Sequence, residues 1–189
     1  MKKFILSSIF ILLIAVPPAF AVEVGGVDVP NTLTVDKEKL VLNGAGTREK
    51  WFLDLYVGGL YLKEKSKDAQ KIIDADKPMA ILIHITSGMI TEKRMADATE
   101  EGFKSTTNGN TKPLQSKIDV FIDEFSKAIK PNDIYELAYA PGKGVTITKN
   151  GKPGQPIKGL EFKKVLFGIW IGPKATVNKS LNKAMLGLK

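Results

Sequence analysis

The hydrophobic and polar positions of residues 47–62 alternate as they do in a β-strand. The odd positions form an apolar face, provided that no bulge shifts the alternation. The even positions form a mixed face of Arg48, Lys50, Phe52, Asp54 and Tyr56. The sequence Gly44-Ala45-Gly46 predicts a turn before this segment. The pattern therefore predicts one long strand with a fixed positive charge, Arg48, at its head.

Shorter hydrophobic blocks predict further strands on both sides of this segment. Residues 22–35 and 39–43 carry strand-like apolar pieces, and the continuous apolar run 79–86 predicts a strand that is buried on both faces. Three more strands are predicted at 133–140, 144–149 and 155–159. Asn150-Gly151, between the last two, is typical of a tight β-hairpin turn.

Five segments have helical character. They span 66–76, 91–105, 114–129, 159–170 and 175–187. Thr91 is the predicted N-cap of the second helix, and Gly172-Pro173 separates the last two because proline interrupts a regular helix. Together the strands and helices predict one α+β domain, with an antiparallel sheet and helices on one side.

The first 21 residues have the layout of a secretory signal peptide. Two lysines follow Met1, the apolar run 4–16 comes next, and Ala19-Phe20-Ala21 supplies the small residues of a cleavage site. The alternative is an uncleaved membrane anchor, but this run is shorter than the roughly 20 residues that span a bilayer. We therefore predict a signal peptide at 1–21, export to the periplasm, and a mature single domain of 22–189 that does not span the membrane.

The basic charge of the chain does not indicate a nucleic-acid partner. The formal net charge is +8, which becomes +6 when the two lysines of the signal peptide are removed. The lysines are scattered, and no arginine-rich block with interleaved aromatic residues occurs, so a solvated surface explains the charge. The mature chain has two arginines, Arg48 and Arg94. A planar guanidinium is well suited to recognise a carboxylate or an enolate.

The residue types that the chain lacks exclude several kinds of site. There is no cysteine, which excludes thiol catalysis and thiolate metal ligands, and the one histidine, His84, is expected in the core or in a cavity wall. Neither a serine-hydrolase nucleophile motif nor a phosphate-binding loop occurs. We predict no metal, no cofactor and no catalytic residue.

Arg48 is the strongest candidate for a binding residue. Asp54 and Tyr56 share its predicted face, beside an aromatic strand. The alternative is that Arg48 forms an ion pair with Asp54 or Glu49 at the rim of the sheet. The residues alone leave both interpretations open.

Three separated segments resemble the chalcone isomerase superfamily. The first is "LNGAGTREKWFLDLYVGGLYL" at 42–62, where a glycine-rich turn and an arginine precede a strand ending in a Gly-x-Tyr-Leu type of motif. The others are "YAPGKGVTITKNGK" at 139–152 and "FKKVLFGIWIG" at 162–172. The resemblance covers almost all of the mature chain and is greatest to the bacterial exported branch of the superfamily.

The resemblance implies an open-faced β-sandwich, in which helices are layered on a large antiparallel sheet and a ligand cleft lies between them. On this scaffold plant chalcone isomerases close a flavanone ring, and related members bind fatty acids without catalysis. By the resemblance, Arg48 corresponds to the arginine that stabilises an enolate in the enzymes and meets a carboxylate in the lipid-binding members.

The resemblance also implies that the other polar positions of the plant enzymes are largely changed. Tyr56 stands where a carbonyl-polarising threonine is expected, and Thr91 stands near the place of a catalytic tyrosine. The place of an asparagine falls near Ala98 or Thr99, and that of a threonine falls at Ile169. Ring closure needs several fixed donors around the developing enolate, so binding is favoured over catalysis. The predicted ligand-binding residues are Arg48, Tyr56 and Thr91.

Three functions remain open at this point. The first, which we favour, is a carrier or sensor of a fatty acid or other small amphipathic acid with Arg48 at the head group, because an apolar pocket with few polar groups is a common design for ligand sites. The second is an envelope protein that contacts another component and binds no ligand. The third is an isomerase of the chalcone isomerase type, which is an intramolecular lyase.

Overall fold

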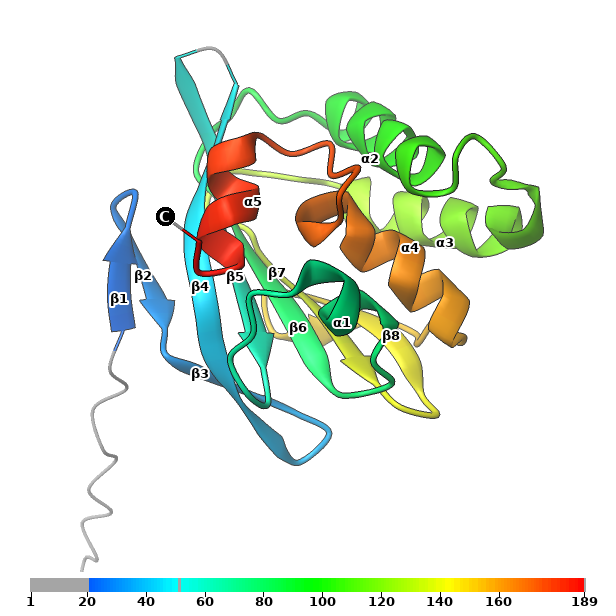
Figure 1. The fold of residues 1–189 in the computed structure, drawn as a ribbon. Coiled ribbons are helices and arrows are strands. Elements are labelled where there is room, and N and C mark those ends of the chain that lie inside the picture. The colour runs from blue at the N-terminus through cyan, green and yellow to red at the C-terminus, as the bar shows by residue number, and fades with distance from the viewer. Residues whose placement is uncertain (1–20, 51, 189) are drawn as a thin grey trace, which may run out of the picture.

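The computed structural model describes residues 21–50 and 52–188, and within them a curled antiparallel sheet carries helices on one face (Figure 1). The sheet has seven strands in the order β3-β4-β5-β6-β7-β8-β9. Their bounds are Thr32–Val35, Glu38–Lys50, Leu53–Leu62, Met79–Ile85, Ile134–Ala140, Gly144–Lys149 and Lys152–Pro153. A separate ribbon pairs β1 (Ala21–Val24) with β2 (Val27–Pro30). The predicted signal peptide lies outside the described residues except for Ala21, so its cleavage stays a prediction.

Over residues 21–50 and 52–188 the helices agree in number and order with the five predicted segments. They are α1 (Ala69–Asp74), α2 (Glu92–Thr106), α3 (Gln115–Ser126), α4 (Leu160–Ile171) and α5 (Lys179–Met185), and a short 3-10 turn, Lys112–Leu114, precedes α3. Within the described residues, none of these helices has the length and apolar character that crossing a membrane requires. The predicted α+β class, with helices on one side of an antiparallel sheet, is confirmed.

The prediction of one strand over 47–62 is wrong, because two strands and a turn occupy this segment. β4 ends at Lys50 and β5 begins at Leu53. Phe52 lies in the turn between them and is fully exposed. Residues 51–52 are aromatic and include no glycine, asparagine or proline, the residues that usually indicate a turn. The local sequence therefore does not indicate this hairpin.

The predicted turn at 44–46 is also wrong, because β4 runs straight through it. Gly44 and Gly46 instead allow α5 to lie against the strand: a Cβ atom on Gly44 would be 2.0 Å from the carbonyl oxygen of Ala184, and one on Gly46 would be 2.7 Å from the Ala184 Cβ. Glycine within a strand is typical of such a close approach. These two glycines therefore serve helix packing.

The turn that follows β8 was predicted at the correct position, but the strand after it was predicted at 155–159 and lies at Lys152–Pro153. Asn150 and Gly151 both have positive φ, 49° and 77°, as a two-residue hairpin turn of type I′ requires. The strand that follows is Lys152–Pro153, whereas within 155–159 Ile157 forms an isolated bridge to Val145. Pro153 within this strand and Pro156 after it have no backbone N–H donor, which keeps the strand short.

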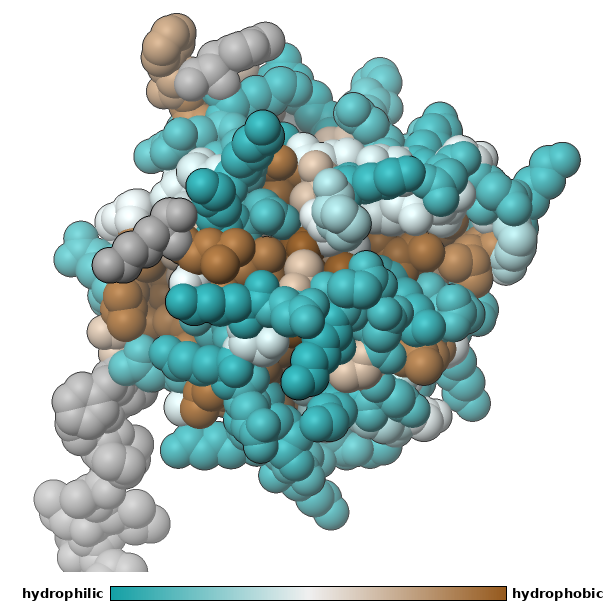
Figure 2. All heavy atoms as spheres, viewed as in Figure 1, coloured by the Kyte–Doolittle hydropathy of each residue, from teal (hydrophilic) through white to brown (hydrophobic). Residues whose placement is uncertain are grey.

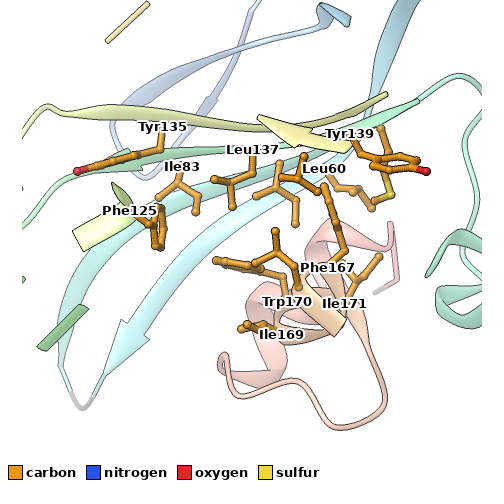
Figure 3. Packing of buried hydrophobic residues seen from close by; sticks show 14 of the residues in the cluster. Leu60, Ile83, Phe125, Tyr135, Leu137, Tyr139, Phe167, Ile169, Trp170 and Ile171 are labelled. Atoms are coloured by element: carbon orange, nitrogen blue, oxygen red, sulfur yellow. The ribbon is translucent and has the colours of Figure 1, made fainter. Parts of the chain in front are cut away.

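The main core fills the space between the sheet and the helices. Phe103, Phe121 and Phe162, from three different helices, have ring centroids 5.8 to 6.0 Å apart. Figure 3 shows Ile83 and Leu137 of the sheet on one side, with Phe167 and Trp170 of α4 on the other. The opposite face of the sheet has a smaller apolar cluster, which is covered by the β1–β2 ribbon.

Lys163 is a fully buried cation that joins α4 to the end of α1. Its Nζ donates hydrogen bonds to the carbonyl oxygens of Ile72, Ile73 and Ala75 at 2.9, 2.7 and 2.8 Å. These carbonyls are among the acceptors that a helix leaves unpaired at its C-terminus. Burial lowers the pKa of Lys163 to about 8, although two nearby aspartates act in the opposite direction.

We expect Lys163 to make the protein more stable as the pH rises from 8 toward 10. Its pKa in the folded state, about 8, lies below the ordinary value of 10.5. In this window the unfolded chain binds the additional proton, so a rise in pH favours the folded state. The full effect is about 3 kcal/mol, at roughly 1.4 kcal/mol for each tenfold change in proton affinity.

Urea denaturation of wild type and Lys163→Met at pH 7.5 to 10 measures this effect. Methionine is an unbranched side chain that lacks the ionisable group, so the difference in unfolding free energy between the two proteins isolates Lys163. Equal pH dependence in both proteins would contradict the prediction.

Candidate functional site

A cavity of about 390 Å³ lies between the sheet and the helices, beside the β4–β5 hairpin. Its wall is formed by the hairpin, by β6 and the loop after it, by α2 and α3, and by the end of α4 with the segment that follows. Most of the wall is hydrophobic, including Leu55, Ile83, Met95, Phe125 and Trp170. Its volume falls in the range of roughly 300–1,000 Å³ that is usual for small-molecule pockets.

The cavity has an exposed mouth and a buried interior. Leu53 and Met89, on the mouth, are 44% and 46% exposed, whereas Ile83 and Phe125, inside, are 0% and 1% exposed. Figure 2 shows hydrophobic residues reaching the surface in a band across an otherwise largely hydrophilic face. The wall therefore includes exposed hydrophobic side chains at the mouth and fully buried ones inside.

Arg48 is held at one side of this cavity by the segment between α4 and α5. Its Nη2 donates to the Thr176 carbonyl oxygen at 3.2 Å and its Nη1 to Asn178 Oδ1 at 3.3 Å. Among the described residues, no carboxylate forms an ion pair with Arg48, so the alternative of a pair with Asp54 or Glu49 is wrong. Arg48 contacts Glu49 through the backbone carbonyl alone, at 3.5 Å. The half-buried guanidinium lines the cavity instead.

Tyr56 is the direct cross-strand neighbour of Arg48. The two residues are paired in the β4–β5 register, and residues opposite each other in an antiparallel pair have side chains on the same face. The two residues thus share a face, as predicted, but they do so across a hairpin.

The Tyr56 hydroxyl is a buried hydrogen-bond donor. It accepts a hydrogen bond from Trp170 Nε1 at 3.0 Å, which leaves its own proton for another acceptor. Burial raises the pKa of Tyr56 to about 12, although the positive charge of Arg48 and the hydrogen bond from Trp170 act in the opposite direction. The hydroxyl is therefore protonated at neutral pH.

Arg94 is a cavity residue that the sequence interpretation did not include in the site. It lies on α2, lines the mouth, and donates from Nη1 to the Met89 carbonyl oxygen at 2.9 Å. Both arginines of the mature chain thus line one cavity, from the sheet side and from the helix side. The scarcity of arginine among many lysines was the available indication in the sequence, but it did not show that the two arginines line the same cavity.

A family comparison agrees with this geometry. The family model described as chalcone isomerase-like matches residues 21–187. The chain belongs to the chalcone isomerase-like family. A search of curated proteins gives no significant match. The assignment to a bacterial exported branch stays a prediction.

The chalcone isomerase fold is also found among solved structures. The crystal structure of a fatty-acid binding protein from Arabidopsis thaliana is similar to this chain with a TM-score of 0.65 and 19% sequence identity. The similarity covers 85% of this chain and 92% of that one. The predicted open-faced sandwich is therefore confirmed at the level of the fold.

Thr91 does not line the cavity of this chalcone isomerase-like protein. Its Oγ1 accepts a hydrogen bond from the Arg94 backbone N–H at 3.3 Å, so it is the N-cap of α2, as predicted. Its predicted role in ligand binding stays untested, and the geometry does not bring it to Arg48. Ala98, Thr99 and Ile169, the other positions suggested by the family resemblance, do line the cavity.

The charged groups of this chalcone isomerase-like cavity are gathered at its mouth. They are Arg48, Lys50, Arg94, Asp97 and Glu101. Within residues 21–50 and 52–188, no three His, Asp or Glu side chains come together as a metal site would require. The arrangement suits a ligand that combines an acidic head group with a hydrocarbon tail.

His84 is not part of this cavity. It is half-buried in β6 and paired with Val57, and its neighbour Ile83 is the β6 residue that lines the wall. Successive side chains of a strand point to opposite faces, so His84 belongs to the other side of the sheet.

Proposed function

We propose that this protein is an exported, non-catalytic carrier of a fatty acid or another small amphipathic acid. The ligand lies in the cavity, with its carboxylate at Arg48 and its tail against the apolar wall. The observation that carries this proposal is the pairing of Arg48 with Tyr56 at one side of an otherwise largely hydrophobic cavity. Two adjacent donors, one of them a cation, match the two oxygens of a carboxylate.

Arg48 has N–H groups that its contacts within the protein do not use and that a ligand can bind. A guanidinium carries five N–H groups, and its contacts to Thr176, Asn178 and Glu49 all come from the two Nη atoms. The Nε–H has no acceptor among the described residues. The hydrogen bonds to Thr176, Asn178 and Glu49 orient the guanidinium, so it loses less entropy when it binds an anion.

The fold comparison supports the same ligand class. The Arabidopsis protein of the same fold is a fatty-acid binding protein, and we extend that ligand class to this chain as part of the proposal. Catalysis of ring closure is disfavoured because Ile169 offers no donor and Thr91 is used as a helix cap. An isomerase would lack fixed donors that commonly contribute about 10²–10³ each to the rate.

Export and binding are tested together by one experiment. The full chain is expressed in a Gram-negative host, the periplasmic fraction is purified without detergent, and native mass spectrometry is followed by lipid extraction. We expect a polypeptide that lacks residues 1–21 and carries one bound fatty acid. A chain that starts at residue 22 and stays in the cytoplasm is the control for export.

Three results would contradict the proposal in different ways. An intact N-terminus in a membrane fraction would favour an anchored protein. A mature protein that is empty, and that binds none of the added C12–C18 fatty acids, would favour an envelope protein that acts by contact with a partner. Turnover of a chalcone above the uncatalysed rate would favour the isomerase.

A further inference from the structure

Three buried aromatic side chains, those of Tyr56, Phe125 and Trp170, line the cavity. Phe125 of α3 lines the cavity and is 1% exposed. The ring centroids of Tyr135 and Phe121 lie 5.1 and 5.2 Å from that of Phe125, and neither of these residues lines the cavity. Phe125 therefore separates the empty space from the solid core.

The contacts of Phe125 hold it in place. Its ring meets Tyr135 edge-on, with an interplanar angle of 74°, and Trp170 edge-on at 80° and 6.4 Å. Figure 3 shows Phe125 below Tyr135 and Ile83 of the sheet, with Trp170 of α4 to its side. Such edge-to-face contacts favour one ring orientation. A ligand tail that reaches this ring meets a fixed wall.

The volume of the cavity sets the length of chain that fits in front of this wall. A cavity of 390 Å³ holds roughly 13 groups of the size of a water molecule, at about 30 Å³ each. A methylene group is of similar size, and a carboxylate contributes three such atoms. The space therefore corresponds to an unbranched acid of about ten to twelve carbons.

We propose that Phe125 sets the ligand length, so that the protein selects medium-chain acids of about ten to twelve carbons. This inference rests on the proposed function, since it takes the carboxylate to lie at Arg48. Each methylene that fits between Arg48 and Phe125 adds to affinity, whereas further methylenes cannot pass the ring while the carboxylate stays at Arg48, so they add nothing.

Isothermal titration calorimetry with unbranched acids from C8 to C16, each below its micelle concentration, tests this inference. In the wild type, affinity is expected to rise by about fourfold per added carbon until C10–C12, and then to level off. In Phe125→Leu the smaller side chain leaves room for a longer chain, so the rise continues for about one more carbon, at roughly 30 Å³ per group. Phe121→Leu is the matched control, because Phe121 is on the same helix, is fully buried, and does not line the cavity.

A second variant tests the opposite direction and does not depend on shortening a core side chain. Ile83→Phe fills part of the cavity from the sheet side, so levelling-off is expected at a shorter chain. An unchanged break point in both Phe125→Leu and Ile83→Phe, or an equal shift in Phe121→Leu, would overturn the role of Phe125 and leave the carrier function standing. A wild type that binds none of the acids would overturn the carrier function itself.

Discussion

Replacement of Arg48 by alanine is expected to weaken the binding of a C12 fatty acid by about 10- to 150-fold. A hydrogen bond to a charged group contributes about 1.5–3 kcal/mol. The other cations that line the cavity, Lys50 and Arg94, are exposed, whereas Arg48 is half-buried and paired with Tyr56. Tyr56 alone supplies a neutral donor. Isothermal titration calorimetry at pH 7.5 measures the loss, and thermal unfolding of the same samples shows whether the variant is folded.

Two further variants separate the guanidinium of Arg48 from positive charge in general. Arg48→Lys keeps the charge and loses the planar fork, so its affinity is expected between those of wild type and Arg48→Ala. Arg94→Ala removes the other arginine, which is on the exposed surface of α2, and a change of at most about fivefold is expected from a screened surface charge. A larger loss in Arg94→Ala than in Arg48→Ala would place the head group at α2 and contradict its proposed position at Arg48.

Replacement of Gly44 by alanine is expected to destabilise the protein by about 1–3 kcal/mol. The added Cβ would lie 2.0 Å from the Ala184 carbonyl oxygen and 3.1 Å from that of Met185. Both atoms are backbone, so the clash is relieved only by a shift of α5 or of the strand. For a domain of this size each kcal/mol lowers the melting temperature by roughly 2–4 °C, which calorimetry resolves.

The displacement of α5 should also reach the ligand site. Asn178, at the N-terminus of α5, holds Arg48 at 3.3 Å, so Gly44→Ala is expected to lower ligand affinity as well as stability. Gly58→Ala is the matched control: its Cβ would contact the flexible ends of Leu181 and Met185 at 3.4 Å. Equal destabilisation by the two substitutions would show that the close approach of β4 and α5 is not the cause.

Most of the secondary structure could be predicted from the sequence, because it depends on neighbours along the chain. The N-cap role of Thr91 and the turn at Asn150-Gly151 follow from local hydrogen bonding and from backbone angles. The hairpin between β4 and β5 could not be predicted in this way. Phe52 lies in its turn, and an aromatic residue is not a usual turn signal, so the local sequence does not indicate the pairing of Arg48 with Tyr56.

The candidate site could be predicted only in part. Arg48 and Tyr56 were identified from the sequence and lie in the cavity wall, but Thr91 was assigned by analogy and lies outside it. Arg94 was noticed only as a rare residue type. Its approach to the cavity depends on how α2 lies over the sheet, and the spacing of residues within α2 carries no information about that.

The sequence by itself determined the α+β class, the order of the helices, and the absence of cysteine and of a histidine cluster, since these depend on composition and local periodicity. The tertiary structure decided which side chains share the cavity and why β4 contains two glycines. The contact between Arg48 and Asn178 joins residues 130 positions apart. Such contacts form only when whole elements pack against each other, so no short stretch of the chain predicts them.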